Sequence, residues 1–216
     1  HFAIYHQRSY TNPSPPWPLA QPFRMLAHNG EINTLKGNMN WMRSHEIRMA
    51  SGTFGEAAED IKPIIPPGTS DSGALDSVFE VLVRAGRNAP MAKTMLVPEA
   101  WSKQTTGMPK AWADMYAYCN AVMEPWDGPA ALAMTDGRWV CGGLDRNGLR
   151  PLRYVVTGDG LLIAGSEAGM VPVDETVVRE KGALGPGQLS AVDIAEGRLY
   201  HDREIKDKLA AAQPFG

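Results

Sequence analysis

The segment PAALAMTDGRWVCGGLDRNGLRPLRYVV, residues 129–156, decides the fold class of this 216-residue chain. Its apolar runs are separated by the pairs Asp136-Gly137 and Asn147-Gly148. Such pairs between apolar runs indicate β-hairpins, because Asn, Asp and Gly tolerate the positive φ angles of tight two-residue turns. A hairpin returns the chain beside itself, so the strands that it joins are antiparallel. The segment therefore predicts antiparallel sheet.

Helices and further strands are expected on both sides of this segment. The clearest helix follows Ser70, a residue type that caps helix N-termini, and is expected to end near Gly86. The apolar residues that recur there at helical spacing are Leu75, Val78, Phe79, Leu82 and Val83. We also expect helices over residues 34–49, 109–123 and 202–212, strands over 1–5, 23–28, 160–167 and 187–194, and loops over 12–22 and 51–69.

The order of these elements is mixed, with hairpins in place of repeated βαβ units. This order predicts an α+β fold with largely antiparallel sheets and helices packed outside them, in one domain over residues 1–216.

The composition is that of a soluble globular protein, with 44% hydrophobic and 21% charged residues. A net charge of -3 gives no reason to expect nucleic acid or an anionic membrane as a partner. No apolar run approaches the roughly 18 residues of a membrane span. Two cysteines and five scattered histidines show no metal-ligand spacing, so no metal is predicted and a cytoplasmic location is expected.

The pair Asn29-Gly30 ends an apolar run and has two interpretations. Asn-Gly is a common turn, and for an isolated pair that interpretation is the more frequent one. The alternative is an oxyanion hole, in which the Asn side-chain NH₂ and a backbone N–H next to Gly both point at a developing negative oxygen. The flanking residues alone do not decide between them.

Arg8 and Asp71 together suggest a site for a free amino acid. An arginine between a strand and a Pro-rich loop can form two parallel hydrogen bonds to a carboxylate. Asp71 is either a helix cap or the partner of a ligand ammonium group. One residue for each end of a zwitterion is what such a site requires.

Several segments resemble a known family. RSYTN at 8–12, LAHNGEINTLKGN at 26–38 and TSDSGALD at 69–76 resemble the class II glutamine amidotransferases, which are N-terminal nucleophile hydrolases. Longer segments are similar to glutamate synthase large chains in particular. They are WPLAQPFRMLAHNGEINTLKGNMNWM at 17–42, MLVPEAW at 95–101, MEPWDGPAALAMTDGR at 123–138 and LDRNGLRPLRY at 144–154. The resemblance covers nearly the whole chain.

The resemblance implies a fold and a set of site residues. The fold would be a four-layer αββα sandwich, incomplete at the N-terminus, in a glutamine amidotransferase domain over residues 1–216. By this resemblance Arg8 would bind the glutamine α-carboxylate with Thr11 beside it, Asn29 and Gly30 would form the oxyanion hole, and Asp71 would hold the α-amino group. His28 and Glu31 would shape the loop, with His28 counted among the substrate-binding residues.

The family's nucleophile is a cysteine at the mature N-terminus, whose own α-amino group serves as base. Residue 1 here is His1, so that segment is missing from this sequence. Cys119 in an expected helix and Cys141 in an expected hairpin are predicted to be buried and inert, because a reactive thiol needs a neighbour that lowers its pKa. The isolated chain is therefore expected to have no glutaminase turnover.

The resemblance also implies partners for the chain. L-glutamine would be the substrate, and the ammonia would pass to other domains that aminate 2-oxoglutarate to L-glutamate. Those domains would carry FMN and an iron–sulfur cluster, with no cofactor in this chain. A small flavoprotein subunit is a further candidate partner, and the electron donor stays open among NADPH, NADH and ferredoxin. Arg146, Arg150 and Arg153 are expected to pair with acidic neighbours or to face other domains.

Two other functions are weighed against this one. An amidotransferase of nucleotide or amino-sugar synthesis would share the short motifs and lack the longer ones. A non-catalytic glutamine- or glutamate-binding module would keep the pocket and lack the nucleophile.

Overall fold

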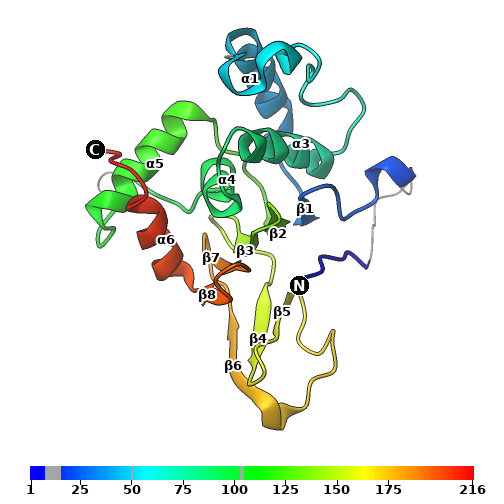
Figure 1. The fold of residues 1–216 in the computed structure, drawn as a ribbon, viewed down its shortest axis with the longest axis vertical. Helices are drawn as coiled ribbons and strands as arrows, with labels where there is room; N and C mark the ends of the chain where they lie inside the picture. The colour runs from blue at the N-terminus through cyan, green and yellow to red at the C-terminus, as the bar shows by residue number, and fades with distance from the viewer. Residues whose placement is uncertain (8–15, 50, 103–104) are drawn as a thin grey trace.

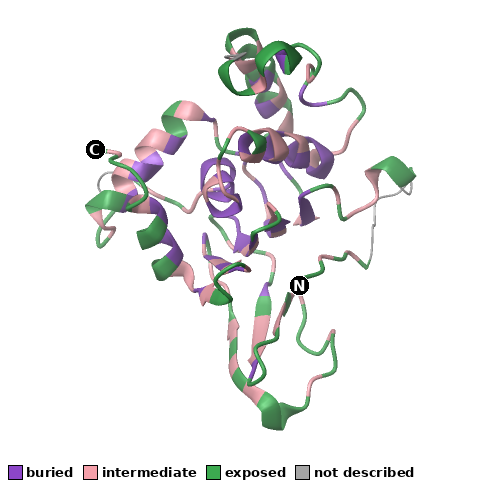
Figure 2. Ribbon diagram, viewed as in Figure 1, coloured by how far each residue is buried: buried purple, intermediate pink, exposed green. Residues whose placement is uncertain are grey.

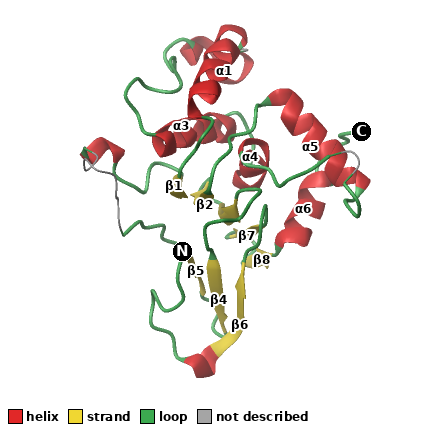
Figure 3. Cartoon of the chain, turned by 180° about the vertical axis from the view of Figure 1, so that it is seen from behind, coloured by secondary structure: helices red, strands yellow, loops and turns green. Residues whose placement is uncertain are grey.

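The computed structural model describes residues 1–7, 16–49, 51–102 and 105–216. Helices gather around one antiparallel sheet, and a second sheet extends from it (Figure 1). Figure 3 shows from behind that this second sheet projects away from the main group of helices, with one short helical turn at its far end. The strands are β1 Leu26–Gly30, β2 Ala130–Thr135, β3 Trp139–Leu144, β4 Arg153–Thr157, β5 Leu162–Gly165, β6 Val178–Ala183, β7 Leu189–Asp193 and β8 Arg198–Tyr200.

The first sheet has five strands in the order β1-β2-β3-β7-β8, and each described pairing is antiparallel. Strands β2 and β3 form the hairpin that Asp136-Gly137 predicts. Asp136 Oδ1 accepts the N–H of Arg138 at 2.9 Å and that of Trp139 at 2.7 Å, and Gly137 has a φ of 94° that favours glycine. This prediction is confirmed.

The second sheet has three strands in the order β5-β4-β6, again antiparallel. The hairpin predicted at Asn147-Gly148 is wrong, because the strands on either side of it belong to different sheets. The buried carboxylate of Asp145 accepts the N–H of Asn147 at 2.9 Å and, in the other direction, that of Ala130 in β2 at 2.9 Å. After β3 the chain therefore leaves the first sheet and enters the second, instead of folding back beside β3.

Most of the helices predicted from the sequence are present in the structure. They are α1 Leu35–Arg48, α2 Ser51–Phe54, α3 Asp71–Arg84, α4 Ala89–Leu96, α5 Lys110–Val122 and α6 Asp202–Ala210, with the 3-10 turns η1 Trp17–Leu19, η2 Gly55–Ala58 and η3 Glu175–Val177. Helix α3 begins as predicted, with the Ser70 hydroxyl accepting the N–H of Gly73 at 3.0 Å.

Several elements differ from the prediction. Residues 1–5 form no strand, because no neighbouring strand pairs with them in the described part of the chain. Strand β1 begins at Leu26 and ends at Gly30 instead of covering 23–28, and the expected loop 51–69 contains α2 and η2. Helix α4 and strands β6 and β8 were not predicted. Almost every residue of α4 is buried, so it has no polar face to reveal a helical period.

The hydrophobic core lies between the first sheet and helices α3, α4, α5 and α6. Figure 2 shows buried residues concentrated on α3, α4 and the first sheet, and mostly intermediate or exposed residues on the second sheet. Phe79, Met115 and Leu132 are each at most 2% exposed. Each such side chain contributes roughly 1.5–3 kcal/mol relative to an exposed one. The α+β class with antiparallel sheets is confirmed, and the arrangement is consistent with an αββα sandwich. None of the described helices is long and apolar enough to cross a membrane.

Candidate functional site

Asn29 and Gly30 are the last two residues of β1, so the pair is not a two-residue hairpin turn. Gly30 has a φ of 151°, and a Cβ there would lie 1.7 Å from the carbonyl oxygen of Pro129. That oxygen accepts the N–H of Glu31 at 2.9 Å. Only glycine allows the backbone to approach this closely.

The hydrogen bonds between β1 and β2 determine which way the Gly30 N–H points. Thr135 N donates to Met25 O at one end of the pairing, and Glu31 N donates to Pro129 O at the other. In an antiparallel pair only alternate residues bond to the partner strand, so the N–H groups of His28 and Gly30 point away from β2. At His28 this outer edge is occupied by Gln21, whose Oε1 accepts the His28 N–H at 2.6 Å. The Gly30 N–H points outward from the end of the strand.

The side chains of His28 and Asn29 lie on opposite faces of β1, because successive side chains alternate along a strand. Asn29 Oδ1 accepts a hydrogen bond from Nη2 of Arg150, which follows β3 and precedes β4. The pairing expected for Arg146 is confirmed by its Nε, 3.0 Å from Asp127 Oδ1. The partner of Arg150 is the neutral Asn29 and not an acidic neighbour, and the alternative that Arg150 faces other domains stays a prediction.

His28 is 2% exposed, and its Nδ1 lies 2.8 Å from the hydroxyl oxygen of Ser72 in α3. Burial lowers the pKa of His28, the nearby Asp71 opposes that shift, and Arg150 adds to it. The imidazole is therefore neutral near pH 7. The Pro129 carbonyl beside the ring also opposes the lowering of the His28 pKa, although Nε2 makes no well-aligned hydrogen bond among the described residues. A role for His28 at the substrate stays a prediction.

Asp71 is the first residue of α3, and Ser70 is its N-cap, so Asp71 is not the capping residue. Its Oδ2 accepts the N–H of Ile32 at 2.9 Å, and its Oδ1 accepts the N–H of Ser72 at 2.7 Å. Asp71 therefore joins the start of α3 to the segment that follows Gly30. A carboxylate has about four acceptor sites, so this one retains capacity for an ammonium group.

Arg8 and Thr11, the residues predicted to bind the α-carboxylate, lie outside the described residues. Of the predicted set, the structure places Asn29 and Gly30 at the end of β1, and Asp71 near His28 and beside the segment that follows Gly30. Sequence reasoning missed Gln21 and the contact of Arg150 with Asn29. Nothing in the sequence marks the pairing of Arg150, because it is 121 residues from its partner.

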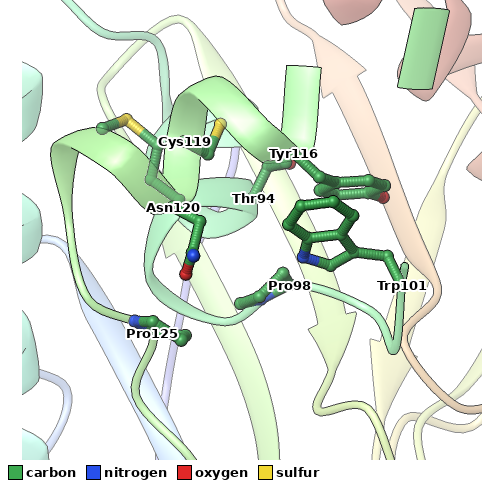
Figure 4. A pocket seen from close by; sticks show the side chains of 8 residues that line it. Thr94, Pro98, Trp101, Tyr116, Cys119, Asn120 and Pro125 are labelled. Atoms are coloured by element: carbon green, nitrogen blue, oxygen red, sulfur yellow. The ribbon is translucent and has the colours of Figure 1, made fainter. Parts of the chain in front are cut away.

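Neither cysteine lies near these residues, and the prediction that both are buried is confirmed. Burial raises the pKa of the Cys119 thiol to about 12 and holds that of Cys141 well above its ordinary value. Cys119 borders a cavity of about 10 Å³ between α4 and α5 (Figure 4), together with Trp101 and Tyr116. That volume is about the size of one water molecule, so no substrate reaches the Cys119 thiol there.

A larger groove, of about 770 Å³, lies between η1, the 61–69 loop and α3. Its lining is largely apolar, with an ion pair of 3.0 Å between Arg24 and Glu80. Neither Asn29, Asp71 nor a cysteine lines it. The described ranges contain no group of three His, Cys, Asp or Glu side chains that could hold a metal ion.

Comparison with known proteins identifies what the chain is similar to. The family described as class-II glutamine amidotransferases matches residues 1–216. The chain is 66% identical over 215 residues to the glutamate synthase [NADPH] large chain of Azospirillum brasilense, covering 99% of this chain and 14% of that one. It is 49% identical over 218 residues to the chloroplastic ferredoxin-dependent glutamate synthase of Spinacia oleracea, covering 100% of this chain and 13% of the relative.

A third relative, the glutamate synthase [NADH] of Saccharomyces cerevisiae, is 49% identical over 216 residues, covering 100% of this chain and 10% of its own length. The resemblance to glutamate synthase large chains is therefore confirmed. The chain spans between a tenth and a seventh of the length of these relatives.

Proposed function

This chain belongs to the class-II glutamine amidotransferases, and on that premise we propose that residues 1–216 are the glutamine-hydrolysing domain of a glutamate synthase. The observation that carries the proposal is the end of β1. There the Asn29 side chain and the outward Gly30 N–H lie beside the segment that Asp71 holds through Ile32. An oxyanion hole needs two such donors, and an amino acid needs one such carboxylate.

In the proposed reaction a cysteine thiolate attacks the side-chain amide carbon of glutamine. The negative charge that develops on the amide oxygen is held by Asn29 Nδ2 and the Gly30 N–H. The amide nitrogen takes a proton and leaves as ammonia, and water then releases glutamate from the thioester. Arg8 and Thr11 hold the α-carboxylate of the substrate, and Asp71 holds its α-ammonium group.

The thiolate of this proposal comes from outside residues 1–216. Cys119 and Cys141 do not qualify, since burial raises the pKa of each thiol. The isolated chain then binds glutamine without hydrolysing it. The same observation favours a second candidate function, that of a non-catalytic module that binds glutamine or glutamate.

The proposed partners follow from the similarity to glutamate synthases. Ammonia would pass to a separate domain and condense with 2-oxoglutarate with loss of water, and FMN and an iron–sulfur cluster, expected in other domains, would supply the electrons that reduce the imine to L-glutamate. The three relatives are named for NADPH, ferredoxin and NADH, and identity is higher with the NADPH large chain than with the other two. A large chain implies a smaller partner chain, so we include a small flavoprotein subunit among the partners.

Glutamate release tests the proposal. The full-length protein that contains this chain should release glutamate and ammonia from L-glutamine. The isolated 216-residue chain should bind L-glutamine in a calorimetric titration without hydrolysing it. Binding without turnover by both forms would favour the non-catalytic module. The absence of both binding and turnover in a folded full-length protein would contradict both functions.

A further inference from the structure

Arg150 contacts the proposed oxyanion hole and has no role in the reaction described above. Its Nη2 donates a hydrogen bond to Asn29 Oδ1. A guanidinium carries five N–H donors and no acceptor. The guanidinium is therefore compatible with only one of the two orientations of the Asn29 amide, the one that presents Oδ1 to Arg150. The flipped amide would set an NH₂ group against the guanidinium, donor against donor.

The orientation of this amide decides whether it assists the reaction. The terminal torsion of an Asn side chain is broad and roughly two-fold, so an amide without a partner samples both orientations. With Oδ1 on Arg150, the Nδ2 donor is left for the oxygen that gains negative charge. With the amide flipped, Oδ1 itself would face that oxygen and repel it. A positive charge at Oδ1 also polarises the amide and strengthens Nδ2 as a donor.

The segment that carries Arg150 is held in place at both ends. Before it, the Asp145 carboxylate fixes the turn, and Gly148 packs so closely on Pro186 that a Cβ would lie 2.8 Å from the Pro186 Cα. After it, Leu152 is buried against Ala131 and Leu144. The Nε of Arg150 is itself buried. The guanidinium is thus presented from a packed segment rather than from a free loop.

We propose that Arg150 is a positioning residue, which fixes the Asn29 amide so that Nδ2 rather than Oδ1 faces the reacting oxygen. This inference rests on the proposed glutaminase function. It assigns to the segment LDRNGLRPLRY a part in the reaction through a residue that does not touch the substrate.

The test compares four variants of the full-length protein by their glutaminase kcat and KM. Arg150→Lys keeps a group that only donates, Arg150→Gln presents an amide that can either donate or accept, and Arg150→Met does neither. Arg146→Met is the matched control, because Arg146 lies in the same segment and pairs with Asp127 instead of Asn29. Thermal melts establish that each variant is folded.

The expected order of kcat is wild type, then Lys, then Gln, then Met. The full loss should be roughly 10- to 100-fold, somewhat below the loss that follows removal of an oxyanion-hole donor, with KM changed by less than about threefold. Arg146→Met should keep the wild-type kcat. A merely structural role for Arg150 would instead make kcat follow the melting temperature.

Two outcomes would overturn the inference. Wild-type kcat in folded Arg150→Met would show that Asn29 needs no partner. If the Met variant does not fold, wild-type kcat in Arg150→Gln would show that Asn29 needs no partner that can only donate. A loss in Lys as large as in Gln would show that donor character is irrelevant. Absence of turnover in the wild-type protein would overturn the proposed function itself, and the inference with it.

Discussion

The side-chain amide of Gln21 makes both of the hydrogen bonds to the main chain of His28 that a neighbouring strand would make. Its Nε2 donates to His28 O at 2.9 Å, and its Oε1 accepts the His28 N–H at 2.6 Å. Gln21 thereby covers the free edge of β1 immediately before Asn29. An uncovered strand edge is a site for unwanted pairing, and here one side chain blocks it.

Replacing Gln21 should therefore destabilise the end of β1. Gln21→Leu keeps much of the side-chain volume and leaves the N–H and C=O of His28 without their partners, which costs about 1–3 kcal/mol. Urea denaturation measures the loss, and amide exchange at His28 should accelerate in the variant. Gln21→Glu should also destabilise at neutral pH, because a carboxylate oxygen would then face His28 O. Equal stability of Gln21→Glu and the wild type would contradict the double contact.

Gly30 and Gly37 offer a pair of glycines with opposite expected effects. Gly30→Ala places a Cβ 1.7 Å from Pro129 O at a φ of 151°, so the backbone at the end of β1 must move. The expected loss of stability exceeds about 4 kcal/mol, in the range of the severe single substitutions.

Gly37→Ala is the control, because Gly37 lies in α1 and a Cβ there would meet nothing within 4 Å. That variant should gain about 0.5–1 kcal/mol from helix propensity. Melting temperatures of both variants test the comparison. A Gly30→Ala protein as stable as the wild type would contradict the close approach of β1 to Pro129.

Asp71 should control glutamine affinity. Asp71→Asn removes the negative charge proposed to hold the substrate ammonium and leaves one oxygen for the two N–H groups that the carboxylate accepts, those of Ile32 and Ser72, so a thermal melt must establish that the variant is folded. We expect binding to weaken at least tenfold, or about 1.4 kcal/mol, by calorimetric titration with L-glutamine. Asp60→Asn, an exposed carboxylate, should bind as the wild type does. Unchanged affinity in Asp71→Asn would remove Asp71 from the site.

Lys93 should make stability depend on pH in the alkaline range. This α4 residue is 2% exposed and donates to Leu144 O at 2.9 Å. Burial, aided by the charge of Lys206, lowers the pKa of Lys93 from 10.5 to about 7. Between these values the unfolded chain binds the proton and the folded protein does not, so stability falls as pH falls toward 7.

Lys93→Met removes this titration and keeps the length of the side chain. The stability of the variant minus that of the wild type should therefore rise as pH is lowered from about 10 to about 7, by at most about 1.4 kcal/mol per pH unit. Below pH 7 the difference should level off. Urea denaturation of both proteins at about pH 7, about pH 8 and about pH 9 measures this difference in the free energy of unfolding. A difference that does not change with pH would show that Lys93 is charged when folded.

Local patterns predicted the parts of the fold that local interactions determine. The apolar residues at helical spacing after Ser70 predicted α3, and Asp136-Gly137 predicted the β2–β3 hairpin. Both succeeded because the interactions of caps and turns act within a few residues. The second turn pair did not form a hairpin, because the buried Asp145 carboxylate bonds to the N–H of Ala130. That contact is not local in the sequence, so a local pattern does not predict it. Helix α4 was missed because it is buried on nearly all sides.

The same division holds for the candidate site. Asn29, Gly30 and Asp71 were predicted from short motifs and from the family resemblance, and the structure brings Asp71 to the segment that follows Gly30. Gln21 and Arg150 were not, because their roles arise from contacts that only the folded chain creates. Asn29 and Arg150 are 121 residues apart in the sequence.

The alternation of side chains along β1 has a consequence for errors in pairing. A slip of β1 by one residue against β2 would exchange the faces of His28 and Asn29, putting an imidazole where the amide belongs. Three features oppose such a slip: the Gln21 amide at His28, the Asp76 carboxylate that accepts the N–H of Met25 at 2.9 Å, and the contact at Gly30 that no residue with a Cβ could make. The chemistry proposed for this domain therefore depends on strand alignment, and a substitution of Gln21 or Asp76 that loosens this alignment would impair the site without changing a residue in it.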